Sequence, residues 1–384
     1  MRKGLIVSAL AVLVAAVVAS TAVARTAEPA AASQLATCTN VSLGMVGPLT
    51  GVAAFLGQEQ LSWLQFGAQD YNKKNGTRFK VVQGDTQLKA DVARTVARRM
   101  VSNRNVMAVI GPSESQAVRS GAKLMSGANL AMVSGSATAV DLTKGKPYKS
   151  FFRVVPNDGV QGPTIANYVS GTLKARNVVV VDSQDDYSRP LAQAITRQLR
   201  KAKVTVTRQS VAADDTDFSS VVTNVGSNVN VVVFATQVAT AANTMSNQLR
   251  EQGKRAIVFG TDGAYSPSQF KPRSGYVSVF SPDPSFDPSA RRVVNAYKTW
   301  SKNKSFGAFG PATYVAGLVA MSAIQRVCQQ TGRVNRAAVV AAVRRTRLSS
   351  ITSKNPIRFD GKGDVRGGKF VIYRVTNGQY APVG

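Results

Sequence analysis

Hydroxyl side chains follow two apolar runs of this 384-residue chain, at points where helices are expected to begin. The stretch "AVIGPSESQAV" leads through a glycine and a proline to Ser113, Glu114 and Ser115, and "MVSGSATAV" leads to Ser136 and Thr138. Hydroxyls, backbone amides and the first turn of a helix together bind a carboxylate group. Such residues are also ordinary helix N-caps, so one loop alone is weak evidence. The two loops together favour a site for a small anion.

Carboxyl side chains follow other apolar runs. Asp158 lies in "PNDG", Asp185 and Asp186 lie in "DSQDDYS", and Asp262 lies in "GTDG". A buried carboxylate holds an ammonium group through charge-assisted hydrogen bonds, and Tyr187 adds a hydroxyl that can close over the ligand. These side chains therefore fit a small zwitterion such as an amino acid. Acid–base catalysis by the carboxylates, as in glycosidases, is the alternative that they leave open.

Several kinds of chemistry are absent from the sequence. The chain has no histidine, which excludes Ser-His-Asp catalysis and histidine metal sites. It also lacks a GxGxxG motif after a strand, a GxxxxGK[ST] phosphate loop and a paired CxxC motif. We therefore expect a protein that is not an enzyme and that has no catalytic residue, no metal site and no cofactor.

The elements that must position these residues alternate along the chain from Val41 onward. Strands are expected at "VSLGMVG", "FKVVQG", "VMAVIG", "LAMVSG", "NVVVVDS", "VTVTRQS", "VNVVVFA" and "AIVFGTDG". Helical spacing is found over 58–72, 90–101, 117–126, 162–173, 190–201 and 240–252, and later over 289–301, 311–330 and the stretch "RVNRAAVVAAVRRTR". Val/Ile runs between helices indicate doubly wound parallel sheets, which bind ligands in the loops beyond the carboxyl ends of their strands. Near the C-terminus, "TNGQ" predicts a tight hairpin.

The N-terminus is expected to lie outside the fold. Two basic residues precede the apolar run "GLIVSALAVLVAAVVASTAVA", which indicates a signal peptide over 1–24 and export from the cytoplasm. An uncleaved membrane anchor is the alternative. Residues 25–38 are read as a flexible leader. In an oxidising compartment Cys38 and Cys328 are expected to form a disulfide, although Cys38 could instead carry a lipid.

The net charge of +28 comes from 48 basic and 20 acidic residues. The basic residues are scattered and form no block interleaved with aromatics, so we interpret them as a solvated surface with weak attraction to an anionic envelope. We expect no nucleic-acid partner, and salt-dependent binding to polyanions is the alternative.

Several of these stretches, in this order and spacing, resemble the type I periplasmic solute-binding proteins of ABC transporters, in particular the leucine/isoleucine/valine-binding group. The resemblance covers the chain from about Val41 to its end. The stretches that carry it are "GMVGPLTGVAAFLGQEQ", "IGPSESQAV", "MVSGSATAVDLT", "FFRVVPNDGVQGPTIANYV", "DDYSRPLAQAI", "GAFGPATYVAG" and "FDGKGDVRGGKFVIYRV".

The resemblance implies a role for each head-group residue. Ser115 and Thr138 match hydroxyls that contact the ligand carboxylate and ammonium, and Ser136 matches a main-chain contact. Asp262 matches the acid, usually a glutamate, that holds the ammonium. Two further positions of the family pattern are the acid of the first crossover and the lid-side tyrosine, here Asp158 and Tyr187.

Three positions bear on the ligand side chain. Leu56 stands where an aromatic residue often packs, and Gln237 stands where a tyrosine is common. Phe309 lies in "GAFGPATYVAG", which resembles the family's aromatic-then-tyrosine helix start. The pocket that these residues form does not identify the ligand.

The resemblance also implies the fold and the partners. We expect two doubly wound lobes joined by three hinge crossings, with lobe 1 over 39–157 and 282–364 and lobe 2 over 158–281 and 365–384. A monomer in the periplasm or on the outer face of the cytoplasmic membrane would close on an amino acid, branched-chain or similar, and deliver it to a membrane permease. The alternatives are another small solute, such as an amide, urea or aromatic acid, and a role as a ligand sensor.

Overall fold

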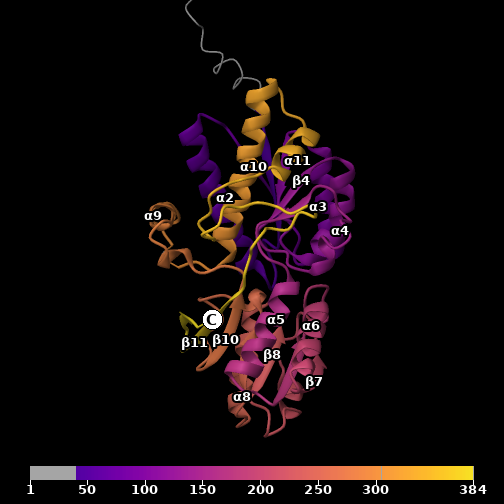
Figure 1. The fold of residues 1–384 in the computed structure, drawn as a ribbon, viewed down its shortest axis with the longest axis vertical. Coiled ribbons are helices and arrows are strands. Elements are labelled where there is room, and N and C mark those ends of the chain that lie inside the picture. The colour runs from indigo at the N-terminus through magenta and orange to yellow at the C-terminus, as the bar shows by residue number, and fades with distance from the viewer. Residues whose placement is uncertain (1–39, 304, 384) are drawn as a thin grey trace, which may run out of the picture.

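The computed structural model describes residues 40–303 and 305–383, which form two α/β lobes one above the other (Figure 1). The upper lobe holds a five-stranded parallel sheet in the order β2-β1-β3-β4-β5. Its strands are β1 (Ser42–Gly47), β2 (Lys80–Asp85), β3 (Val106–Ile110), β4 (Ala131–Ser134) and β5 (Phe151–Arg153). Its helices are α2 (Ala54–Asn75), α3 (Ala90–Ser102), α4 (Ser115–Gly127), α10 (Phe309–Thr331) and α11 (Arg336–Arg344), with α9 (Arg291–Ser301) at its side.

The lower lobe holds a seven-stranded sheet in the order β12-β11-β10-β9-β8-β6-β7. Its strands are β6 (Asn177–Asp182), β7 (Thr205–Ser210), β8 (Val231–Ala235), β9 (Ile257–Gly260), β10 (Gly275–Val279), β11 (Val371–Thr376) and β12 (Gln379–Pro382). Its helices are α5 (Asp158–Asn167), α6 (Ser188–Lys201), α7 (Ser219–Thr223) and α8 (Ala239–Glu251). The strands are parallel from β7 to β10, and β11 and β12 add an antiparallel edge.

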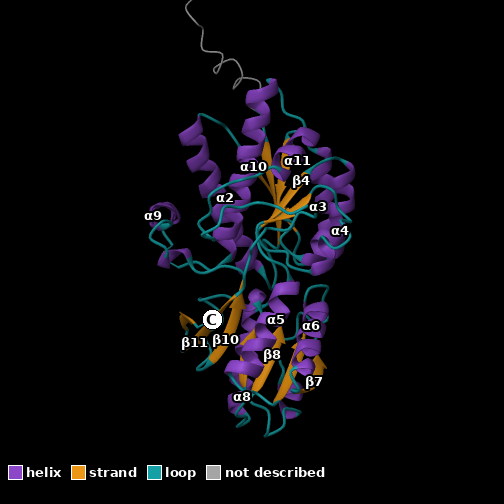
Figure 2. Cartoon of the chain, viewed as in Figure 1, coloured by secondary structure: helices purple, strands orange, loops and turns teal. Residues whose placement is uncertain are grey.

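Both faces of each sheet are covered by helices (Figure 2). Alternate residues of one strand therefore enter different cores. In β6, Val178 and Val180 pack with residues of α5 and α6, whereas Val179 and Val181 join the core that contains Met245 of α8. This explains why the strands read as continuous apolar runs rather than as alternating ones.

Three connections run between the two lobes. The first joins β5 to α5 through 154–157, the second leaves β10 through 280–283, and the third enters β11 through 366–370. Arg153 and Asp364 tie the first and third connections together, since the fully buried guanidinium Nε donates to Oδ1 of Asp364 at 2.5 Å.

The structure confirms the fold class and all eight predicted strands. It adds two strands that the sequence analysis missed, the three-residue β5 and β10, whose sequence Gly275–Val279 is GYVSV. The predicted hairpin joins β11 to β12, with Asn377 and Gly378 at φ 50° and 78°. The predicted signal peptide and leader and Cys38 lie outside the described residues, so these expectations and the disulfide with Cys328 stay predictions, as do the exact lobe boundaries. None of the helices in the described part of the chain has the length and apolar character needed to cross a bilayer.

Candidate functional site

The first hydroxyl loop leaves the upper sheet at the end of β3. Gly111 has a φ of 115°, and a Cβ there would lie 2.4 Å from the carbonyl oxygen of Val46, so the turn requires glycine. Ser113 turns inward, where its hydroxyl donates to Oε1 of Gln60 at 2.5 Å. Glu114 is buried against the hydroxyl of Thr86. Of the three polar residues in this loop, Ser113 and Glu114 are therefore engaged inside the upper lobe, and the role of Ser115 stays a prediction.

The second hydroxyl loop is bound to the first. The Ser115 hydroxyl accepts a hydrogen bond from the backbone N–H of Ala139 at 3.3 Å. Arg153 donates from Nη1 to the carbonyl oxygens of Ala137 and Ala139, at 3.1 and 2.8 Å, on either side of Thr138. Thr138 is 1% exposed, and its hydroxyl makes no hydrogen bond of normal geometry within the described structure. Its backbone is thus held on both sides, while its buried hydroxyl has no hydrogen-bond partner among the described residues.

Asp158 lies at the start of α5, in contact with the second hydroxyl loop. Its backbone N–H donates to the carbonyl oxygen of Thr138 at 2.9 Å. The carboxyl group is buried, and neither oxygen has a hydrogen-bond partner among the described residues. Burial, and after it the charge of Asp262, raise the pKa of Asp158 from 3.8 to about 8, although the nearby Thr138 hydroxyl opposes the shift. Such a group requires a cation or a proton.

Asp262 lies in the lower lobe, in the 3₁₀ turn Asp262–Ala264 that follows β9. Its Oδ1 accepts hydrogen bonds from the Tyr187 hydroxyl at 2.5 Å and from Nε2 of Gln161 at 2.7 Å. Burial raises the pKa of Asp262 to about 6, and these two hydrogen bonds act against the shift. Burial and the neighbouring acids raise the pKa of Tyr187 well above its usual value, so the phenol stays a donor. The structure thus brings together Thr138, Asp158, Tyr187 and Asp262.

The two lobes also contact each other beside this cluster. Nε2 of Gln237, from the lower lobe, donates to Oε1 of Gln116 on α4 at 3.3 Å. Arg119, one turn further along α4, donates to the carbonyl oxygen of Asp186 at 2.7 Å and forms two hydrogen bonds with Asp141, at 2.6 and 2.8 Å. The lobes therefore meet in a closed arrangement. The sequence analysis identified Gln237 but missed Gln116, Arg119 and Gln161, since single polar residues on a helix carry no motif.

The two apolar candidates lie within the upper core. Leu56 and Phe309 are each 2% exposed, and the ring of Phe309 packs against Phe280 with 5.3 Å between centroids. Ser136 is buried at 7% exposure in the second hydroxyl loop. Leu56, Phe309 and Ser136 are thus all buried in the upper lobe.

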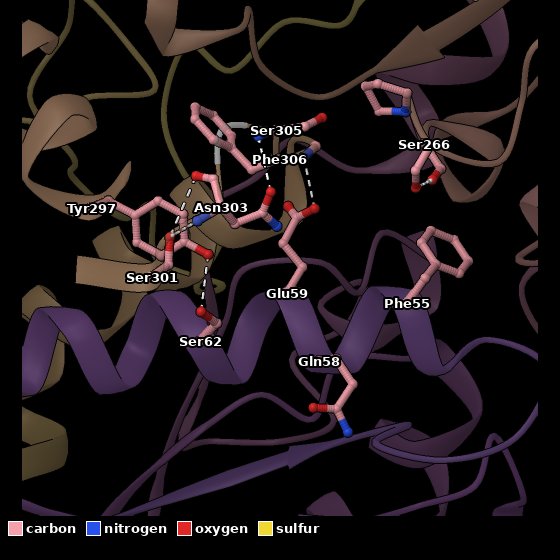
Figure 3. Close-up of a pocket in the computed structure, with 13 residues that line it drawn as sticks. Phe55, Gln58, Glu59, Ser62, Ser266, Tyr297, Ser301, Asn303, Ser305 and Phe306 are labelled. Atoms are coloured by element: carbon pink, nitrogen blue, oxygen red, sulfur yellow. Dashed lines mark hydrogen bonds between the residues drawn. The ribbon is translucent and has the colours of Figure 1, made fainter. Parts of the chain in front are cut away.

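Glu59 of α2 fixes the start of α10 and was not identified from the sequence. Its carboxylate accepts a hydrogen bond from the backbone N–H of Gly307 at 2.6 Å (Figure 3). It accepts another from the backbone N–H of Gly310 at 2.7 Å. Burial raises the pKa of Glu59 to about 7 against these bonds. The surrounding pocket, about 360 Å³, is lined by upper-lobe residues and by Ser266 to Ser268 of the lower lobe. Among the described residues, no group of three or more Cys, Asp or Glu side chains is placed to hold a metal ion.

Comparison with known proteins decides the family. A family model described as "Periplasmic binding protein" matches residues 40–379, nearly all of the described chain. The chain belongs to the periplasmic binding protein family. This confirms the resemblance seen in the sequence and makes the protein a solute-binding receptor rather than an enzyme.

Individual periplasmic binding proteins match over most of their length. The chain is 26% identical to the "Amino acid binding protein" of Pseudomonas aeruginosa, over 87% of this chain and 90% of that protein. It is 24% identical to the Leu/Ile/Val-binding protein of Escherichia coli K12, over 89% and 92%. The crystal structure of the leucine binding protein LivK from Thermotoga maritima superposes with a TM-score of 0.80 at 23% identity and covers 90% of this chain and 98% of that one. The structural match supports the two-lobed fold of this periplasmic binding protein.

Proposed function

We propose that this periplasmic binding protein captures a free amino acid between its lobes. The observation that carries the proposal is the facing pair of buried acids, Asp158 and Asp262, of which Asp158 has two unpartnered oxygens. An α-ammonium group between them would replace the missing cation and would be desolvated together with both carboxylates, where charge-assisted hydrogen bonds are strong. The Thr138 hydroxyl lies next to the same carboxyl group and completes the ammonium site.

The α-carboxylate of the ligand is assigned to the hydroxyl loops. The first turn of α4, which begins at Ser115, offers free backbone N–H groups and the positive end of a helix dipole. Ser115 and Ser136 add a hydroxyl and a main-chain contact beside it. Tyr187, already bonded to Asp262, closes this head-group site from the lower lobe. In this proposal the acid pair binds the ammonium group of the zwitterion, and the hydroxyl loops bind its carboxylate.

The class of the ligand side chain follows from the relatives and from three residues. The curated relatives carry the names amino acid binding protein and Leu/Ile/Val-binding protein, and Leu56 and Phe309 are apolar. We therefore propose a branched-chain or similar amino acid. Gln237 is the polar exception, and it favours a side chain smaller than an aromatic ring or one with a polar end.

The mechanism follows from the two lobes and their three connections. The open protein binds the ligand on one lobe, and rotation about the connections brings Tyr187 and Asp262 onto it while water is expelled. The contacts of Arg119 with Asp186 and of Gln116 with Gln237 then hold the closed form. We propose that a monomer, exported by its N-terminal signal, presents this closed form to the permease of an ABC transporter.

Calorimetric titration with a panel of amino acids tests the proposal. The wild-type protein should bind at least one of them, and both Asp262→Ala and Thr138→Ala should weaken that binding, because each removes a contact to the ammonium. Asp214→Ala, at an exposed site in the lower lobe, is the matched control and should leave the affinity unchanged. Binding that both site variants retain would contradict the proposed site. If solutes without an ammonium group are the only ones bound, an amide, urea or aromatic acid becomes the ligand class.

A further inference from the structure

A second pocket lies between the lobes at the hinge, away from the acid pair. It has a volume of about 340 Å³, within the range of small-molecule sites. All three interlobe connections contribute to its wall, through 154–156, 280–282 and 365–369. The segment 352–357 of the upper lobe closes it on the remaining side. A molecule in this pocket would therefore touch every segment about which the lobes rotate.

The inner wall of this hinge pocket is apolar and buried. Val155, Phe280 and Ile357 are exposed by 2%, 3% and 1%. Among them lies Ser281, which is 3% exposed and whose hydroxyl has no hydrogen-bond partner among the described residues. Burying a hydroxyl without a hydrogen-bond partner is unfavourable, so the pocket retains an unused donor beside an apolar surface.

The outer rim of the hinge pocket is cationic. Lys354, Arg366 and Lys369 line it, all three are exposed, and no acidic side chain is part of the wall. None of them takes part in an ion pair recorded for the described residues. Arg366 is oriented by its hydrogen bond from Nε to the carbonyl oxygen of Phe359, at 3.2 Å. The rim therefore favours an anion.

We propose that the hinge pocket binds a small carboxylate with an apolar body. Its carbon chain would cover Val155, Phe280 and Ile357, and its carboxylate would accept hydrogen bonds from the Ser281 hydroxyl and from the rim lysines. Because the pocket is built from all three connections in the closed arrangement, its occupant stabilises that arrangement by differential binding. The site has a separate lining from the amino-acid site and does not depend on the identity of that site's ligand.

Backbone hydrogen exchange with sodium hexanoate as the probe tests this assignment, with hexanamide at the same concentration and sodium chloride to match the ionic strength. Exchange in 154–156, 280–282 and 365–369 should slow about fourfold when free hexanoate is about three times its Kd. Hexanamide should protect these segments less, since it lacks the charge that the rim recognises.

Two variants locate the effect. The double variant Lys354→Gln with Lys369→Gln should weaken hexanoate binding roughly fivefold. Adding Ser281→Ala to it should weaken the binding further. The control is the exposed pair Lys73→Gln with Lys201→Gln, which should leave hexanoate binding unchanged. Protection that instead appears at 113–116 and 136–138 and disappears in Asp262→Ala would place hexanoate between the acid pair and overturn the proposal. Equal protection by hexanamide, an equal loss in both lysine pairs, or no protection would also overturn it.

Discussion

Replacing Asp158 by Asn should stabilise the ligand-free protein at alkaline pH while removing its affinity for an amino acid. The amide keeps the shape of the side chain but removes its negative charge. Without a cation between them, Asp158 and Asp262 cannot both be ionised at low cost, so losing one charge relieves their repulsion. Each tenfold change in proton affinity corresponds to about 1.4 kcal/mol. The rise in the pKa of Asp158 from 3.8 to about 8 therefore sets an upper limit of about 6 kcal/mol on the cost of ionising it. Relaxation and water entry reduce this cost, and we expect about 2–4 kcal/mol.

The sign of the pH dependence follows from proton binding. A carboxyl group whose pKa is raised by folding binds its proton more tightly in the folded protein than in the unfolded chain. The stability that it contributes is present below the unfolded pKa of 3.8 and is lost as the pH rises toward about 8. The free energy of unfolding by urea is measured for wild type and Asp158→Asn at about pH 5 and about pH 8.5. The loss of stability over this range should be smaller in the variant by about 70% of the expected cost, because the rest of the effect falls between pH 3.8 and pH 5.

Other buried acids share this trend, so the difference between the two proteins is the measured quantity. Burial also raises the pKa values of Glu59 and Glu114 to about 7, and both groups are unchanged in the variant. Asp214→Asn, at an exposed position, serves as the control and should behave as wild type. The reasoning is wrong if Asp158→Asn loses as much stability as wild type over this range, or if it binds the amino acid with undiminished affinity.

Three further substitutions test the surroundings of the acid pair. Arg119→Ala removes the contact with Asp186 across the lobes and should speed ligand dissociation roughly threefold to tenfold in stopped-flow experiments. An unchanged dissociation rate would show that this contact does not stabilise the closed form. Tyr187→Phe removes a donor to Asp262 and should weaken amino-acid binding by about 1–2 kcal/mol in calorimetry, and an unaltered affinity would count against the site. Arg153→Met leaves the carbonyl oxygens of Ala137 and Ala139 without the guanidinium donor and removes the ion pair with Asp364, so it should lower the free energy of unfolding by about 3–5 kcal/mol, and a loss below about 1 kcal/mol would refute that role.

The fold could be predicted from the sequence because its strands are fully buried. Runs such as "NVVVVDS" have no polar face, which is typical of parallel strands covered by helices on both sides. The strands that were missed have weaker patterns. Phe151–Arg153 is only three residues long and ends in a buried arginine, and Gly275–Val279 begins with a glycine and contains a serine. Their places in the sheets depend on neighbouring strands, which one segment does not encode.

The candidate site could be predicted only in part, because residue type does not fix direction. Ser113 and Ser115 share one loop, yet the hydroxyl of Ser113 binds Gln60 inside the upper lobe. Arg153 holds the loop around Thr138, but its fully buried position follows from packing between segments far apart in the chain. The acids at the ends of apolar runs gave the clearest indication of a binding site, because a buried carboxylate is unfavourable unless a cation or hydrogen-bond donors compensate it. Only the folded structure shows that Asp158 and Asp262, from segments far apart in the chain, lie close together.

The most direct test of the central claim compares an amino acid with the same carbon skeleton without its ammonium group. The natural choice is L-leucine and 4-methylpentanoate, measured by calorimetry, with other amino acids and their deaminated counterparts if leucine is not bound. If the acid pair holds an ammonium group, the amino acid should bind at least about 100-fold more tightly than the deaminated acid. Equal or tighter binding of the deaminated acid would contradict the account.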